Sequence, residues 1–230
     1  MNRVVVTGLG LVTPLGCGVQ NSWNALISGK CGIQRLESSE YDKIPSKVAA
    51  RVPRGGSHPA SLNSEKYVLP SELRTMSPAS LFALVASDEA IKDANITEDD
   101  DLRHQTGVAV GMGMSDLEYI VESAFILRDK GPSRISPYFV PRILNNMAAG
   151  IISIRHKLEG PNHSVSTACA TGAHSIGKMD MCCSHDFTVT DTFFQKEMQL
   201  ISLGMGQLKP WSVEEPNPAS IPSAWQDFLG

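Results

Sequence analysis

Short runs of apolar or β-branched residues alternate along this chain with longer segments in which apolar residues recur at helical spacing. Two of the runs, residues 3–7 (RVVVT) and 106–111 (TGVAVG), are short and continuous, which is typical of strands buried on both faces of a sheet. A third run, residues 164–167 (SVST), is rich in hydroxyl and β-branched side chains and predicts another strand.

Helices are predicted before and between these strands. Ser77 and Ser136 each precede a proline, and a serine cap with proline in the first turn is a common helix start. Gly29 ends the first helical pattern. Because strands and helices alternate, we expect an α/β protein with a largely parallel sheet. The expected helices cover residues 19–29, 77–95, 117–128 and a long segment from 136 through 158.

Other segments lack a regular pattern. Residues 31–71 are rich in Ser, Gly, Pro and charge and are expected to be irregular. After Gly177 the segment KMDMCCSHDFTVTDTFF shows no clear period, and EEPNPASIPSAW is punctuated by proline. We therefore divide the chain into residues 1–177 and an unrelated, loosely structured tail at 178–230. One short helix is expected in that tail, capped by Asp191 and carrying Phe194, Met198 and Ile201.

Composition narrows the functional class. With 230 residues, 42% hydrophobic and 19% charged, the chain resembles an ordinary globular protein with a substantial core. A net charge of −4 and the lack of a Lys- or Arg-rich block argue against nucleic-acid binding. No apolar run has the length of a membrane span, and the N-terminus shows neither a secretory signal nor a transit peptide. The odd number of cysteines, 5, indicates free thiols in a reducing compartment.

Two glycine-rich segments begin like the fingerprint of a dinucleotide-binding loop. In GLGLVT (residues 8–13) and GMGMSD (111–116), however, another residue stands where the third glycine belongs. Tight turns after strands explain these glycines equally well, so no nucleotide cofactor is expected. The segment CCSH (182–185) has adjacent cysteines, which do not match the spacing of zinc ligands, and no metal is expected either.

Cys169 stands where the predicted strand 164–167 turns into a helix. A thiol at such a turn lies at the positive end of the helix dipole, which favours the reactive thiolate. Backbone N–H groups at the helix start can also hydrogen-bond to a carbonyl oxygen that the sulfur attacks. The pattern favours a nucleophilic cysteine, and a buried structural cysteine is the alternative. Small neighbours allow the sharp turn and leave room for a substrate: Ala168, Ala170, Gly172 and Ala173.

Several stretches, in their order and spacing, resemble the β-ketoacyl-[acyl carrier protein] synthases, the condensing enzymes of fatty acid biosynthesis. They are RVVVTGLGLVTPLG, GMGM, SPYFVPRILNNMAAG and LEGPNHSVSTACATGAHSIG. The resemblance extends from residue 3 to about 177 and is strongest to mitochondrial members from animals, through VAARVPRG, GVAVGMGM and IRHKLEGPNH. It implies the N-terminal half of a thiolase-like layered fold followed by a divergent tail. It also implies a mitochondrial matrix location, whereas the sequence otherwise indicates the cytosol.

By this resemblance, Cys169 takes the acyl chain from acyl carrier protein as a thioester, with its own N–H as one oxyanion donor. The implied reaction is decarboxylative condensation of malonyl carrier protein with the Cys-bound acyl chain, with no cofactor. The resemblance also implies that the strand at 163–167 is an edge strand that pairs with its twin in a homodimer. Further positions match residues that line the acyl tunnel, with Met114 and Phe139 reaching across the dimer interface: Gly113, Met114, Phe139 and Ala168. Core packing is the alternative for Met114 and Phe139.

No base for Cys169 is identified. In the resembling family, two histidines and a lysine come from the C-terminal half, in stretches like H-G-T-x-T and K-x-x-x-G-H, and neither occurs here. His174 is predicted to point away from the sulfur, His163 lies too far along the incoming strand, and His185 is a candidate only by default. We therefore expect a truncated or alternatively ended synthase that is catalytically incomplete. A non-catalytic isoform that pairs with full-length synthase is the alternative, and a cysteine hydrolase is a weaker one.

Overall fold

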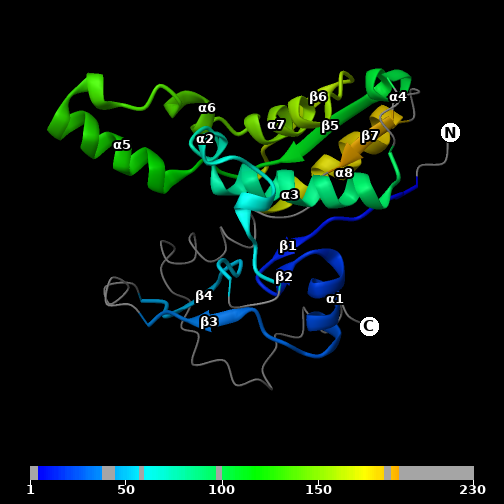
Figure 1. The fold of residues 1–230 in the computed structure, drawn as a ribbon, viewed down its shortest axis with the longest axis horizontal. Helices are drawn as coiled ribbons and strands as arrows, with labels where there is room; N and C mark the ends of the chain where they lie inside the picture. The colour runs from blue at the N-terminus through cyan, green and yellow to red at the C-terminus, as the bar shows by residue number, and fades with distance from the viewer. Residues whose placement is uncertain (1–4, 38–44, 57–59, 97–99, 184–187, 192–230) are drawn as a thin grey trace.

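A small parallel sheet organises the upper part of the molecule (Figure 1). The computed structural model describes residues 5–37, 45–56, 60–96, 100–183 and 188–191. Strand β5 (Thr106–Gly111) is central, and β6 (Asn162–Val165) and β7 (Thr188–Asp191) both pair with it in parallel. β5 is buried along nearly its whole length, as its continuous apolar run predicts. The α/β class and the parallel sheet are confirmed.

Three helices pack around this sheet: α3 (Pro78–Asp93), α7 (Met147–His156) and α8 (Thr171–Cys183). α3 packs against α7, α7 packs against β5 and β6, and α8 contacts every strand of the sheet. The core lies where these elements meet, with Phe82, Leu84 and Ile152 fully buried. α3 is buried on most of its surface, which explains why alanine and serine fill the positions between its large apolar residues.

The helix start predicted at Ser77 is confirmed, whereas the one predicted at Ser136 is wrong, because the next helix begins at Phe139 with Tyr138 as its N-cap. Ser77 caps α3, because its hydroxyl accepts a hydrogen bond from the N–H of Ser80 at 3.2 Å. α1 (Val19–Ile27) ends just before Gly29, whose φ of +70° favours glycine. α5 (Leu117–Lys130) begins at the expected residue, capped by Asp116, and runs slightly further than expected. α4 (Asp100–Gln105) precedes β5. No helix among the described residues is long and apolar enough to cross a membrane.

The segment at 31–71 is more regular than predicted. It contains an antiparallel pair, β3 (Ile33–Arg35) with β4 (Val48–Ala50), and two short helices, η2 (Ser64–Lys66) and α2 (Pro70–Leu73). Another antiparallel pair precedes α1, formed by β1 (Val12–Thr13) and β2 (Gly16–Cys17). These elements are too short for hydrophobic periodicity to mark them, and β3 has no buried face. Figure 1 shows β3, β4 and α1 on the side of α3 away from the sheet.

The prediction of a strand at residues 3–7 is wrong for the part that the structure describes. Its described part, from Val5 onward, forms no strand, and Val5 and Val6 are 56% and 79% exposed. Among the described residues no strand lies beside them to complete a ladder, so the apolar run alone does not make an element.

The single long helix expected from 136 through 158 is also wrong. The chain forms α6 (Phe139–Ile143) and then α7, separated by an extended residue, Leu144, with ψ at 128°. A tertiary contact holds the break, because Asn145 accepts a hydrogen bond from the Ser115 hydroxyl at 3.1 Å and donates one to the carbonyl of Met112 at 3.4 Å. The short helix η3 (Pro132–Arg134) precedes this region. Apolar spacing continues across the break and so hides it.

Regular secondary structure also continues past Gly177, in a segment whose sequence shows no clear hydrophobic period. α8 runs to Cys183, and β7 pairs with β5 in a register that sets Thr106 opposite Thr188. A strand this short gains its order from the ladder that β5 offers, which the local pattern of the strand does not show. The helix expected after Asp191 lies outside the described residues, and the domain division at residue 177 stays a prediction.

Glu89 on α3 fastens the N-terminal segment to the core. One carboxylate oxygen accepts a hydrogen bond from the N–H of Val19 at 2.8 Å, and the other accepts one from Leu11 at 3.0 Å. We expect Glu89→Gln to lower the free energy of unfolding by about 1.5–3 kcal/mol, because the amide removes the charge and turns an N–H toward another N–H. Chemical denaturation measures this loss.

Asp93→Asn is the matched control. Among the described residues, Asp93 makes one hydrogen bond, an exposed one from the N–H of Leu9 at 2.9 Å. Loss of this hydrogen bond should lower the free energy of unfolding by about 1 kcal/mol or less. Equal denaturation midpoints for the Glu89 and Asp93 variants would contradict the prediction.

Candidate active site at the turn after β6

Cys169 lies exposed in the short helix η4 (Ala168–Ala170), which joins β6 to α8. The strand-to-helix turn predicted for this residue is confirmed. Its backbone is unusual, because Ala168 adopts a φ of +51°, a conformation that residues with a side chain rarely take. Such conformations cost free energy and persist only where surrounding contacts hold them, which is common at functional sites.

Thr171 makes several of the contacts that hold the turn at Ala168 and Cys169 in place. Its side chain is only 1% exposed, and its hydroxyl accepts a hydrogen bond from the N–H of Thr167 at 2.6 Å and donates one to the carbonyl of Val165 at 3.1 Å. The hydroxyl of Ser175 in turn donates to the carbonyl of Thr171 at 3.1 Å. The first turn of α8 is therefore tied to the end of β6.

Glycines of β5 and of the loop after it allow close approach to this turn. A Cβ on Gly111 would lie 2.6 Å from the Thr171 carbonyl oxygen and 2.8 Å from the Ser175 hydroxyl. A Cβ on Gly113 would lie 3.2 Å from the Ala168 carbonyl oxygen. The structure thus places Gly113 close to Ala168, the residue before Cys169, and the tunnel role that the resemblance implies for both stays a prediction.

Gly111→Ala should destabilise the protein by about 1–3 kcal/mol, because its methyl group would push the backbone of α8 away from β5. Gly113→Ala is the matched control and should cost less, since a shift of a few tenths of an ångström relieves its contact. Thermal unfolding of both variants tests this, and a larger loss for Gly113→Ala would contradict it.

Phe139 and Met114 lie further from the turn along the chain. Phe139 begins α6, is half-buried, and its ring centroid lies 6.0 Å from that of Tyr119 on α5. Arg142 stacks over the same Tyr119 ring at 4.0 Å and contacts Asp116 at 3.4 Å, so α5 and α6 are joined at this point. Met114 is half-buried in the loop after β5. Their place in an acyl tunnel stays a prediction.

The histidines do not form a base for Cys169 in the described part of the chain. His174 instead contacts Thr167, with 2.7 Å between Nδ1 and the Thr167 hydroxyl oxygen. His163 lies on β6 and is half-buried, and His185 lies outside the described residues. No group of His, Cys, Asp and Glu side chains among the described residues could hold a metal ion.

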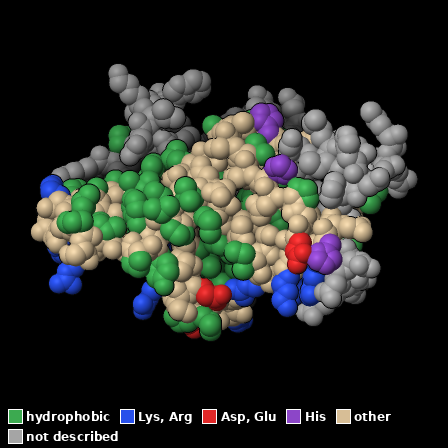
Figure 2. All heavy atoms as spheres, turned by 90° about the horizontal axis from the view of Figure 1, so that it is seen from above, with side chains coloured by type: hydrophobic (Ala, Val, Ile, Leu, Met, Phe, Trp, Pro, Cys, Tyr) green, Lys and Arg blue, Asp and Glu red, His purple; other side chains and the backbone are tan. Residues whose placement is uncertain are grey.

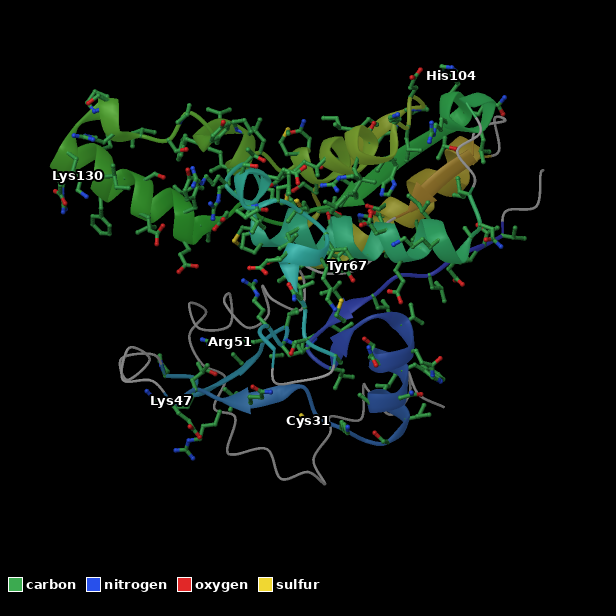
Figure 3. The ribbon with its side chains drawn as sticks, viewed as in Figure 1. Cys31, Lys47, Arg51, Tyr67, His104 and Lys130 are labelled. Carbon is green, nitrogen blue, oxygen red and sulfur yellow. The ribbon has the colours of Figure 1, made fainter. Side chains whose placement is uncertain are left out.

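The other described cysteines differ from Cys169 in their surroundings. Cys17 is half-buried, and burial raises the pKa of its thiol while a hydrogen bond with Tyr67 lowers it. Cys31 is exposed but lies in the lower part of the molecule, far from α8 (Figure 3). Only Cys169 therefore joins an exposed thiol to the start of a long helix in the described structure.

Comparison with known proteins decides the family. The sequence model described as "Beta-ketoacyl synthase, N-terminal domain" matches residues 1–182. The chain belongs to the β-ketoacyl synthase family. It is 47% identical over 178 residues to 3-oxoacyl-[acyl-carrier-protein] synthase 2 of Rhizobium meliloti, covering 77% of this chain and 42% of that enzyme. It is 42% identical over 192 residues to the mitochondrial synthase of Arabidopsis thaliana, covering 76% of this chain and 40% of that one.

Solved ketosynthase structures share the fold. A β-ketoacyl synthase from Burkholderia phymatum matches with a TM-score of 0.69 at 22% identity, covering 91% of this chain and 54% of that one. The ishigamide ketosynthase/chain length factor matches with a TM-score of 0.68 at 24% identity, covering 94% and 52%. The resemblance to the β-ketoacyl synthases and the thiolase-like fold are confirmed.

The relatives differ in how much of this chain they match. The chain spans less than half the length of the Rhizobium and Arabidopsis relatives. A 3-oxoacyl-[acyl-carrier-protein] synthase 2 of Vibrio cholerae is 33% identical over 225 residues, which cover 96% of this chain and therefore reach into residues 178–230. The relatives include both bacterial and mitochondrial synthases.

Sequence reasoning located Cys169 but missed the residues that hold it. Thr167, Thr171 and His174 were not singled out as a set, although their spacing of 4 and 3 residues would place the last two on one helix face. The signal available was a run of hydroxyl residues on both sides of a cysteine.

Proposed function

We propose that this chain is the nucleophile-bearing part of a β-ketoacyl-[acyl carrier protein] synthase, in which Cys169 accepts the acyl chain. The observation that carries the proposal is an exposed thiol at a strained strand-to-helix turn, in a domain of this family. Cys169 lies two residues before the first residue of α8, and the unpaired backbone N–H groups at a helix start are suited to stabilise an oxyanion formed beside the sulfur.

Acyl transfer can be written for this geometry. The Cys169 thiolate attacks the carbonyl carbon of the acyl thioester on the carrier protein, and the carbonyl electrons move onto oxygen. Backbone N–H groups at the turn, including that of Cys169, stabilise the oxyanion. The intermediate then collapses, the bond to the carrier sulfur breaks, and the carrier leaves as a thiolate that takes up a proton. An acyl group on Cys169 remains, ready for condensation with a malonyl carrier.

Acyl carrier protein, in its acyl and malonyl forms, is the proposed partner. One structural neighbour is described as a polyketide acyl-carrier protein in complex with its ketosynthase, which supports this type of partner. Matrix localisation is proposed from the mitochondrial relatives. The tunnel roles of Gly113 and Ala168 are supported by their contact beside Cys169.

A second copy of the chain is the other proposed partner. β6 lies at an edge of the described sheet, with Asn162 and Ser164 exposed, so it can add a strand from a twin. At the opposite end of the upper layer from β6 (Figure 1), α5 exposes about half of Leu117, Val121 and Phe125, at 48%, 52% and 51%. Figure 2 shows hydrophobic side chains gathered on this face, as expected of an interface. Such a dimer would set Met114 and Phe139 near the partner's tunnel.

Intact-mass analysis tests the acyl transfer. The chain is incubated with acylated carrier protein, and its mass should increase by one acyl group, located on Cys169 by peptide mapping. A chain that stays unmodified, while a full-length relative is acylated under the same conditions, would overturn the proposal.

A non-catalytic partner of full-length synthase is the second candidate. Exposed apolar residues on other faces favour it, including Ile176 on α8 at 46% and Val6 at 79%. Acylation of the chain alone separates the two, since a purely structural partner need not react.

A further inference from the structure

A chain of side-chain hydrogen bonds joins residues that lie before and after Cys169 in the sequence. Its last member is Thr171, whose hydroxyl donates to the carbonyl of Val165 at 3.1 Å. The hydroxyl of Thr167 donates to the Thr171 hydroxyl oxygen at 3.3 Å, and it also contacts Nδ1 of His174 at 2.7 Å. The hydrogen bonds therefore tie α8 to the end of β6 across the segment that contains Cys169.

The direction of the bonds follows from the protons available. Each hydroxyl has a single proton, which Thr171 gives to Val165 and Thr167 gives to Thr171. We assign the Nδ1–H tautomer to His174, because the Thr167 hydroxyl proton is directed to Thr171 and leaves the Thr167 oxygen as the acceptor. Bonds aligned head to tail in this way polarise and strengthen one another.

The backbone between these residues is fixed at both ends. The Thr167 N–H donates to the Thr171 hydroxyl at 2.6 Å, and the Thr167 carbonyl accepts from the N–H of Ala170 at 3.2 Å. The strained residue Ala168 lies inside this loop, directly before Cys169. Because a strained conformation relaxes when its surroundings loosen, the contacts of Thr167 bear directly on where the sulfur lies.

We propose that Thr167 and His174 are positioning residues for the Cys169 thiol, acting through Thr171. His174 holds the Thr167 hydroxyl, Thr167 holds the backbone of the turn, and the turn keeps the sulfur at the N-terminus of α8. The histidine therefore acts on the geometry of the nucleophile without serving as its base. The role in acyl transfer rests on the proposed function, whereas the reactivity of the thiol can be measured without it.

Alkylation by iodoacetamide measures that reactivity in the intact chain. The Cys169 thiolate displaces iodide, and the rate follows from peptide mapping over time. Trypsin places Cys17, Cys31 and Cys169 in separate peptides, since Lys30, Arg35, Lys157 and Lys178 lie between or beside them. Exposed Cys31, far from α8, is the internal reference for every variant.

Two pairs of variants test the chain. Thr167→Val keeps the shape of the side chain and removes its hydroxyl, and His174→Ala removes the donor. Each should slow alkylation of Cys169 by about threefold to tenfold, the range that one hydrogen bond supports. Thr167→Ser and His174→Asn retain a hydroxyl and a donor at the position of Nδ1, and both should react within twofold of the unchanged chain.

The rescue separates positioning from a general loss of structure. Unchanged alkylation of Cys169 in Thr167→Val and His174→Ala would overturn the proposal, as would Asn behaving like Ala at position 174. If Thr167→Val unfolds, half-buried Cys17 becomes reactive as well. The proposal is then tested by His174→Ala and His174→Asn, because His174 is exposed and its substitution should not unfold the chain. Normal alkylation together with no acyl transfer in the unchanged chain would instead count against the proposed function alone.

Discussion

Cys169→Ala is expected to abolish acylation of this chain by acyl carrier protein. The exposed sulfur at the start of α8 is the nucleophile of the proposed transfer, and alanine leaves no group that can form the thioester. Intact mass after incubation with the acylated carrier should show no added acyl group, against a clear adduct for the unchanged chain. Because the side chain is exposed, the substitution should leave the melting temperature nearly unchanged.

Cys31→Ala is the matched control for this experiment. Cys31 is also an exposed free thiol, but it lies beside the β3–β4 pair rather than at a helix start. The Cys31 variant should be acylated like the unchanged chain. An adduct that persists in Cys169→Ala, or that maps to Cys31, would show non-specific transfer and remove the central role of Cys169.

Local signals predicted the elements whose formation depends mainly on nearby residues. β5 was expected from its continuous apolar run and is observed over the same residues. The start of α3 was expected from the Ser77–Pro78 pair, and its cap is present. In both cases the sequence contains the whole cause, which is an apolar strand buried in the core or a hydroxyl beside free backbone N–H groups.

Elements that depend on distant partners were missed or misplaced. The run at 3–7 has strand-like residues, yet Val5 and Val6 stay exposed because no described strand lies beside them. β7 has little pattern of its own and forms because β5 presents a free edge. The break between α6 and α7 is held by Asn145 through contacts with residues some 30 positions away. Local propensity does not contain such information.

The site shows the same division. The turn at Cys169 was predicted from the strand, the cysteine and the small residues after it, all adjacent in sequence. Its close contacts with Gly111 and Gly113 were not, because they depend on how β5 and β6 pair. The resemblance to the synthases, which the family match confirms, named Gly113 and Ala168 only as tunnel residues, and that role stays a prediction.

Condensation is the second step, and we expect this chain alone not to perform it. Forming the new bond requires the malonyl group to lose CO₂, and the electron pair left behind must be held as an enolate before it attacks the acyl carbon on Cys169. In the family that the chain resembles, histidines of the C-terminal half donate hydrogen bonds to that enolate. The motifs that carry them, H-G-T-x-T and K-x-x-x-G-H, do not occur in these 230 residues.

The expected loss is large. Removing one such donor typically lowers a rate by about 10²–10³, and here the whole set is lacking. Incubation with acyl and malonyl carrier proteins should therefore give acylated Cys169 and no ketoacyl product by mass spectrometry, while the full-length Rhizobium meliloti relative, as the positive control, gives both. A ketoacyl product from the purified chain, absent in Cys169→Ala, would show that residues of this chain stabilise the enolate themselves. Acylation without condensation would instead separate the two steps and assign the first to the turn between β6 and α8.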